Sequence, residues 1–188
     1  MAARMSRFKI HDDESAPEAA VPILKGVVKS GGQVPNLLGV LANAPAALRG
    51  YVRMRGELRN VTLPRGTQER IALAVAAHHR AEPDLSVHSR AAQREGVGLD
   101  EIARAQEFTS ADPAQAALLA WLRPLVERRE PVPVHLHEAA LEAGWTEEQL
   151  VEAIAVVALE SFAAMVDVAG DVPVDGSGEE TRQLRAVA

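Results

Sequence analysis

Three residues near the middle of the chain have side chains and a spacing suited to acid-base chemistry. Glu69 precedes Asp84 and His88, and the last two are four residues apart. Side chains four residues apart lie on the same face of a helix, so Asp84 and His88 are predicted neighbours. Burial raises the proton affinity of a carboxylate, and a carboxylate beside an imidazole can orient one tautomer. The sequence therefore predicts Glu69, Asp84 and His88 as catalytic residues of a shared pocket.

Each of these residues also has a simpler interpretation. Taken alone, Glu69 is typical of a solvated glutamate beside Arg65 and Arg70, whereas Asp84 is typical of a helix cap and His88 of an ordinary helix histidine. The prediction of a pocket therefore depends on finding the three residues together, at the spacing of a known sequence pattern that is described below.

The chain of 188 residues contains no cysteine, and this absence limits its chemistry. Thiol peroxidase chemistry needs a thiolate nucleophile and a resolving partner, so that class of reaction is excluded. The net charge is -6 and no run of basic residues occurs, which argues against nucleic acid as a partner. We predict a small-molecule substrate handled by carboxylates, imidazoles and pocket shape, without a cofactor.

His78 and His79 are weaker candidates, for a metal site. With Glu69, Asp84 and His88 they offer enough nitrogen and oxygen ligands for a divalent metal. Their spacing matches no strong metal-binding motif, so no metal is predicted.

Two further groups of polar residues lie later in the chain. His135 and His137 follow a Pro-Val-Pro segment and are predicted at the surface, near a helix entry. Glu160 and Asp167 are seven residues apart on one face of an apolar helix. They are either acids of a pocket or partners in interfacial ion pairs. Arg53 or Arg55 could supply the partner.

The elements that must position these residues are helices. Aromatic residues are few and the valines occur in helical patterns, so strand signals are almost missing. We predict an all-α, single-domain bundle of about eight helices. Pro64 opens the helix that carries Glu69, and Pro83 opens the helix that carries His88. The other main helices are predicted at about 17–29, 36–43, 45–59, from 113 and after 146.

A weak internal repeat relates residues 91–102 to residues 139–150. Gly96 and Gly144 suit the left-handed position that ends a helix, and Thr146 with Gln149 forms a capping box for the next helix. Two explanations are open: convergence on a common helix-turn-helix signal, or a duplicated antiparallel helical pair.

The ends of the chain differ in composition from its centre. We predict a flexible N-terminal segment at 1–15, a helical domain at 16–172 and an exposed tail at 173–188. The start lacks the apolar core of a secretory signal, so a cytoplasmic location is predicted.

The longest apolar run, residues 153–169, contains Glu160 and Asp167. It falls short of the roughly 20 apolar residues of a membrane span, so we interpret it as a buried core helix and predict no membrane association. A helix that is apolar on nearly all sides is central or shared between subunits, and a homo-oligomer is expected.

Glu69 and His88 lie in a frame in which a helical glutamate precedes the pattern Cys-x-x-Cys-x-x-x-His. Here Ala81 and Asp84 occupy the two cysteine positions. Similar stretches at 34–38, 68–75, 80–92 and 156–162 extend the likeness over about 34–175. The chain resembles the carboxymuconolactone decarboxylase and alkylhydroperoxidase D superfamily, and residues 80–92 are closest to its cysteine-free branch, where acidic residues precede the same histidine.

The resemblance implies an alkylhydroperoxidase D-like helical fold and a proton-relay role for Glu69 and His88. In cysteine-free members the implied activity is general acid-base chemistry on a lactone or an acidic or carbonyl-bearing small molecule, with Asp84 orienting the imidazole or replacing the missing nucleophile. The alternatives are a non-catalytic binding or assembly protein on the same scaffold, or a peroxidase label carried by similarity alone.

Overall fold

The protein is described by a computed structural model over residues 6–128 and 130–176. These residues form nine helices and no strand, which confirms the all-α prediction with one helix more than the approximate count. The helices are α1 (Val21–Gly31), α2 (Asn36–Leu41), α3 (Pro45–Glu57), α4 (Arg65–His79), α5 (Glu82–Arg94), α6 (Leu99–Gln106), α7 (Pro113–Glu127), α8 (Val134–Glu142) and α9 (Glu147–Gly170).

The described residues group into two compact units, whereas the sequence predicted one domain at 16–172. Residues 6–53 with 165–176 form the first unit, and residues 54–164, without residue 129, form the second. Helices α3 and α9 both continue through the division. No change in composition therefore marks it in the sequence.

In the first unit, the segment before α1 is held by specific contacts. The backbone N–H of His11 donates to the carbonyl of Gly39 at 3.1 Å, and the ring nitrogens of His11 contact Ser15 O at 2.8 Å and Asn43 Oδ1 at 3.3 Å. A Cβ on Gly39 would lie 2.6 Å from His11 O, so only glycine allows this approach. In the predicted flexible segment at 1–15, His11 is thus held by contacts with Gly39, Ser15 and Asn43. Residues 1–5 lie outside the described part.

The first residues of the predicted tail also make contacts. Asn36 Nδ2 donates to Pro173 O at 3.0 Å, and Asp175 Oδ1 accepts a hydrogen bond of 2.8 Å from the backbone N–H of Asn36 at the start of α2. This carboxylate satisfies one of the amide groups that a helix N-terminus leaves unpaired. The described part of the predicted tail, 173–176, thus makes contacts with α2, and the rest, 177–188, lies outside the described residues.

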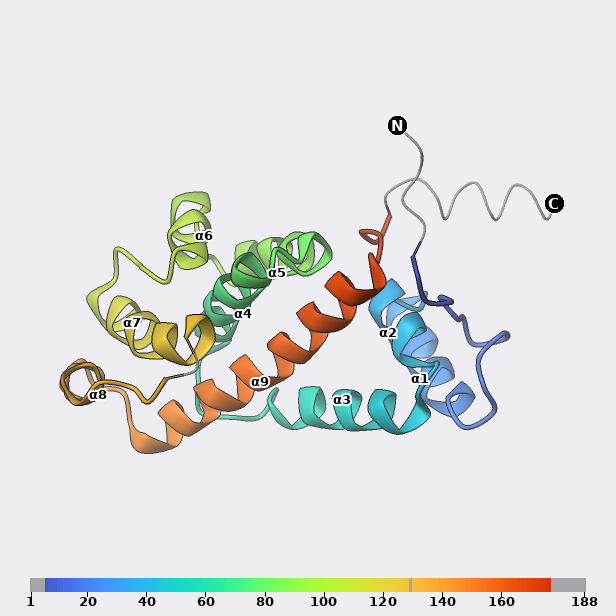
Figure 1. Ribbon diagram of the computed structural model, residues 1–188, viewed down its shortest axis with the longest axis horizontal. Helices are drawn as coiled ribbons and strands as arrows, with labels where there is room; N and C mark the ends of the chain where they lie inside the picture. Colours follow the sequence, from blue (N-terminus) through green and yellow to red (C-terminus); the bar gives the residue numbers. More distant parts are fainter. Residues whose placement is uncertain (1–5, 129, 177–188) are drawn as a thin grey trace. The chain divides into compact units, whose positions relative to one another are not determined.

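Helix α4 is the centre of the second unit and packs against α5, α6 and α7 (Figure 1). Buried residues occur on nearly all of its sides, as expected for a helix in the interior. It ends at Arg80, which has the left-handed backbone conformation with φ of 58°. The N–H of Ala81 then donates to Ala76 O at 2.9 Å, and α5 begins at the next residue. This short turn brings the helices of Glu69 and His88 side by side.

The two halves of the internal repeat end their first helices in the same way. Gly96 and Gly144 have φ of 82° and 98°, and the next N–H groups, of Val97 and Trp145, each donate to the carbonyl five residues earlier. The predicted capping box is confirmed, because Thr146 N donates to Gln149 Oε1 and Gln149 N donates to Thr146 Oγ1, both at 3.2 Å.

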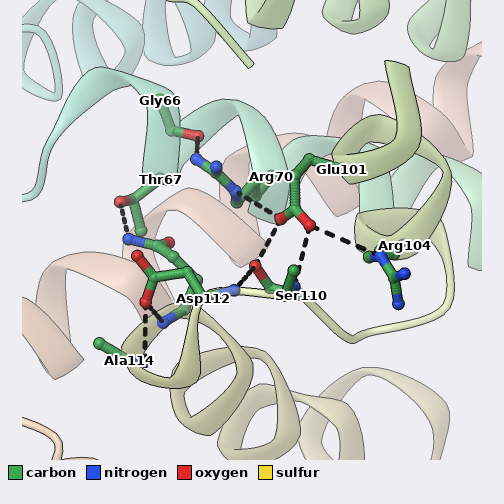
Figure 2. A network of polar contacts seen from close by, with 10 residues as sticks. Gly66, Thr67, Arg70, Glu101, Arg104, Ser110, Asp112 and Ala114 are labelled. Carbon is green, nitrogen blue, oxygen red and sulfur yellow. Dashed lines mark hydrogen bonds and ion pairs between the residues drawn. The ribbon is translucent and has the colours of Figure 1, made fainter. Parts of the chain in front are cut away.

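A polar network fixes the first half of α4 (Figure 2). Glu101 on α6 accepts hydrogen bonds from Ser110 Oγ at 2.5 Å and Ala111 N at 2.9 Å, and its Oε2 lies 3.8 Å from Arg70 Nε on α4. One turn earlier, Thr67 Oγ1 accepts a hydrogen bond of 3.0 Å from Gln115 Nε2 on α7. These contacts flank Glu69 and hold its helix to α6 and α7.

Helix α9 has an exposed apolar side as well as a buried one. Val151 and Ile154 in the second unit are 66% and 42% exposed. In the described residues, α9 is the one helix whose length and composition would allow a membrane crossing. Core helices of soluble proteins meet the same criteria, so this is weak evidence for a membrane span.

We predict that Glu101→Ala lowers the free energy of unfolding by about 1–3 kcal/mol, because charge-assisted hydrogen bonds are lost. The hydrogen bond from Ser110, followed by that from Ala111 and the charges of Arg70 and Arg104, holds the pKa of Glu101 below 4.5. A lowered pKa means that this stabilisation is present above pH 4.5 and is lost as the pH falls through the folded-state value. Urea unfolding at pH 7 and at acidic pH measures both effects.

The matched control is Glu107→Ala, at the exposed end of the same helix. Equal losses for the two variants, or a difference that persists in acid, would contradict the role given to Glu101.

Candidate functional site

A small cavity of about 50 Å³ lies within the second unit. A water molecule needs roughly 10–15 Å³ of such volume, so the cavity holds a few waters or a compact group of similar size. Its lining combines apolar walls with charged and polar side chains: Arg55, Leu58, Arg59, Arg65, Gln68, Glu69, Ala72, His88, Val156, Leu159 and Glu160.

Glu69 and His88, predicted to share a pocket, meet in this cavity. His88 Nδ1 lies 2.8 Å from Glu69 Oε2 in a hydrogen bond, and the residues are 5% and 9% exposed. The turn at Arg80 places α4 and α5 side by side, so residues far apart in the sequence come into contact. The predicted spacing thus locates two members of the site.

Glu160 from α9 is the third member. Its Oε2 lies 3.2 Å from His88 Nε2, and the residue is 8% exposed. This is an ion-pair distance without the alignment of a hydrogen bond: among the described residues, Oε2 of Glu160 has no hydrogen-bond partner. His88 therefore lies between two carboxylates, and Glu160 is a pocket acid, as one of its two sequence interpretations proposed.

The two carboxylates decide the charge of His88. Burial alone would lower the pKa of its imidazole, but the contacts and charges of Glu160 and Glu69 outweigh burial and raise this pKa from 6.5 to about 10. Burial would likewise raise the pKa of Glu160, yet His88, with the more distant charges of Arg55 and Arg65, lowers it. At neutral pH the cluster contains an imidazolium and an ionised Glu160.

Asp84 lies one turn before His88 on α5 and is 7% exposed. It does not belong to the cavity lining, and both ring nitrogens of His88 face glutamates. Glu69 and Glu160 are thus the neighbours of the two ring nitrogens, and the orienting role of Asp84 stays a prediction. Sequence spacing places Asp84 on the face of His88, but it cannot show which neighbour reaches each ring nitrogen.

His78 and His79, the weaker candidates for a metal site, do not line the cavity. The rings of His78 and His79 contact each other edge to face, with centroids 5.1 Å apart, at the C-terminal end of α4. Within residues 6–128 and 130–176, no group of three histidine, aspartate or glutamate side chains is arranged to hold a metal ion. His135 is exposed, in agreement with the predicted surface position.

Three arginines, Arg55, Arg59 and Arg65, complete the cavity wall. Arg65 Nη1 donates to Gln68 Oε1 at 3.1 Å, and Gln68 Nε2 donates to Leu63 O at 2.9 Å, so this part of the wall is fixed. Three guanidiniums and the imidazolium against two carboxylates give the lining a net charge of +2. Sequence reasoning suggested Arg55 but missed Arg59, which lies in the connection between α3 and α4 where helical periodicity does not apply, and Gln68, which lies inside α4 beside Glu69.

Residues 45–124 match the sequence model of the carboxymuconolactone decarboxylase family. This segment is similar to that family. The match contains α4 and α5, and thus Glu69 and His88, and it confirms the resemblance predicted from the sequence. Glu160 lies outside the matched segment, in a helix that only the folded chain brings to the site. None of the functionally curated proteins matches the chain.

Solved structures confirm the fold over nearly the whole chain. The alkylhydroperoxidase AhpD core of an uncharacterized peroxidase-related protein from Ralstonia eutropha JMP134 aligns with a TM-score of 0.80 at 18% identity, covering 93% of this chain and 95% of that one. A peroxidase-related protein from Silicibacter sp. TM1040 gives 0.78 at 15% identity, covering 94% and 96%. The debrominase Bmp8 in complex with 2,3,4-tribromopyrrole gives 0.75 at 19% identity, covering 96% and 98%.

We predict that His88 remains protonated through neutral pH. Its raised pKa means that the imidazolium contributes its full stabilisation below pH 6.5 and loses it as the pH rises through about 10. The stability difference between the wild type and His88→Gln should therefore shrink between these values. Denaturant unfolding across this range measures the difference, and ¹⁵N NMR of the imidazole gives the pKa directly.

The control is His135→Gln, at an exposed position on α8. An imidazole that titrates near its ordinary value of 6.5 would contradict the arrangement of His88 between two carboxylates.

Proposed function

We propose that the protein is a carboxymuconolactone decarboxylase-like enzyme that performs general acid-base chemistry on a small carboxylated, lactone or carbonyl-bearing molecule. The observation that carries this proposal is the buried Glu69–His88–Glu160 cluster in the cavity wall. Buried titratable groups with strongly shifted pKa values in a cavity are typical of sites that transfer protons.

The charge state of the cluster favours a carboxylate as the base. His88 holds its proton at neutral pH and faces a carboxylate on each ring nitrogen. An imidazolium in this position acts as a hydrogen-bond donor and a fixed positive charge. Proton abstraction next to a carbonyl needs both a base and stabilisation of the resulting enolate charge, and the cluster with the arginines supplies both.

The wall of the cavity favours a small anion. The lining has a net charge of +2 in a protein whose net charge is -6, so the local field attracts anions that the remaining surface repels. The volume of about 50 Å³ is far below the roughly 300–1,000 Å³ of pockets for drug-sized ligands. A compact molecule with one acidic group suits both properties.

Thiol chemistry is not part of this proposal, because the chain contains no cysteine. Similar structures include peroxidase-related proteins and a debrominase with a bound small heteroaromatic compound. What carries over to the proposal is a small-molecule pocket on this fold, with ion-pair chemistry in place of a thiol.

The test is deuterium exchange on a panel of small lactones and 2-oxo acids in D₂O. We expect loss of the ¹H NMR signal next to the carbonyl with the wild type. With His88→Gln the rate should be at least about 100-fold lower, because the fixed positive charge that stabilises the enolate is lost. His135→Gln is the matched control, and circular dichroism establishes that each variant is folded.

Equal exchange by the wild type and His88→Gln would contradict the proposed mechanism. Binding of the compounds without any exchange would favour a non-catalytic binding protein on the same scaffold. Hydroperoxide consumption by the purified, metal-free protein would overturn the exclusion of peroxidase chemistry.

A further inference from the structure

The two glutamates that face His88 differ in how they use their oxygen atoms. Glu69 Oε2 accepts an aligned hydrogen bond of 2.8 Å from Nδ1. Glu160 Oε2 lies 3.2 Å from Nε2, and among the described residues it has no hydrogen-bond partner. Oε2 of Glu69 is thus occupied by the hydrogen bond from the His88 ring, whereas Oε2 of Glu160 can still accept a hydrogen bond.

We propose that Glu160 is the catalytic carboxylate that exchanges a proton with the ligand, and that Glu69 is a positioning residue that holds His88. The assignment rests on the acid-base function proposed above, and it reverses the emphasis of the sequence prediction, which gave the acid-base role to Glu69.

The energetics of burial support this division. A buried acceptor without a donor costs about 1–3 kcal/mol, so such groups in folded proteins normally have a partner. Glu160 lines the cavity, and a ligand in the cavity is within reach as a donor. Both glutamates pair in charge with His88, but only Glu69 Oε2 accepts an aligned hydrogen bond from the ring, so Glu69 gains less from a ligand.

The charges around Glu160 also suit a base at neutral pH. His88, Arg55 and Arg65 favour its ionised form against the effect of burial. The same positive groups would lie beside negative charge that forms on a ligand. The carboxylate is therefore ready to accept a proton, and the product charge is stabilised where it forms.

The proposed step is balanced without an oxidant or reductant. The C–H bond next to the ligand carbonyl breaks, and an O–H bond forms at Oε2 of Glu160. The electron pair of the C–H bond moves into the carbonyl group, which becomes an enolate. The protonated Glu160 then returns a proton to carbon, and His88 stays an imidazolium throughout.

Amide substitutions distinguish the two roles. Glu69→Gln keeps an oxygen that can accept the hydrogen bond from Nδ1, so deuterium exchange in the panel above should fall less than about 10-fold, whereas Glu69→Ala should lose more. Glu160→Gln cannot take a proton, so exchange should fall at least about 100-fold. Glu148→Gln, at an exposed position on the same helix as Glu160, is the matched control.

Equal losses in Glu69→Gln and Glu160→Gln, or a larger loss in Glu69→Gln, would overturn the assignment. So would full exchange activity in Glu160→Gln. Thermal unfolding and circular dichroism of each variant separate a chemical loss from a folding defect.

A second measurement needs no turnover. Acetohydroxamic acid is a small enol-like probe with an O–H donor, and ¹³C NMR of protein labelled at glutamate carboxyl carbons reports its contact. We expect the Cδ resonance of Glu160 to shift on titration, with a smaller change at Glu69, and the shift to be absent in Glu160→Gln.

The two measurements separate the failure of the assignment from the failure of the proposed function. If no compound in the panel exchanges with the wild type, the acid-base function fails, and the probe alone decides whether Glu160 is the ligand-contacting carboxylate. A dominant shift at Glu69, or no shift at either glutamate, overturns the assignment.

Discussion

The interaction on which the second unit depends is the buried imidazolium of His88 between two glutamates. Glu69 comes from α4, His88 from α5 and Glu160 from α9, so a single charge cluster links three helices. Two carboxylates this close together in a buried place would repel each other without the imidazolium between them. Removing one member of such a buried cluster typically costs about 3–5 kcal/mol, because the remaining charge is left uncompensated. The cluster on which the proposed acid-base function rests is thus also part of what holds the helices in place.

Such a cluster needs an accurate position for α4, and the surrounding polar contacts supply it. Thr67 and Arg70 lie on either side of Glu69, and each is tied to a neighbouring helix, through Gln115 on α7 and Glu101 on α6. Apolar contacts are not directional, so on their own they would allow α4 to shift slightly along its axis. The directional contacts of Thr67 and Arg70 restrict such shifts of α4, and they therefore help to fix the distance between Glu69 and His88.

Sequence reasoning was most successful where the physical signal is local. The all-α fold, the capping box of Thr146 and Gln149, and the left-handed glycines follow from short-range preferences. The pairing of Glu69 with His88 was accessible because one short turn joins their helices. The contact of Glu160 with His88 was not, because it depends on how a distant helix is packed, which the spacing of residues along one helix does not encode.

The cavity wall and the division into two units were beyond sequence reasoning for related reasons. Arg59 reaches the cavity from the connection between α3 and α4, where no helical period applies. The division falls inside α3 and α9, which continue through it as unbroken helices. In both cases the deciding feature is tertiary contact.

The absence of cysteine has a different meaning once the cluster is known. Ala81, at the first cysteine position of the family frame, is buried in the turn after α4, and Asp84, at the second, lies outside the cavity lining. The chemical groups of the cavity come instead from Glu69, His88 and Glu160. A site that had only lost its thiols would be expected to close over apolar side chains, since replacing a buried ion cluster with well-packed apolar residues is often neutral or stabilising. Here Glu160 instead stays buried at a cavity, held by its ion pair with His88 and with no hydrogen-bond donor for its Oε2 among the described residues.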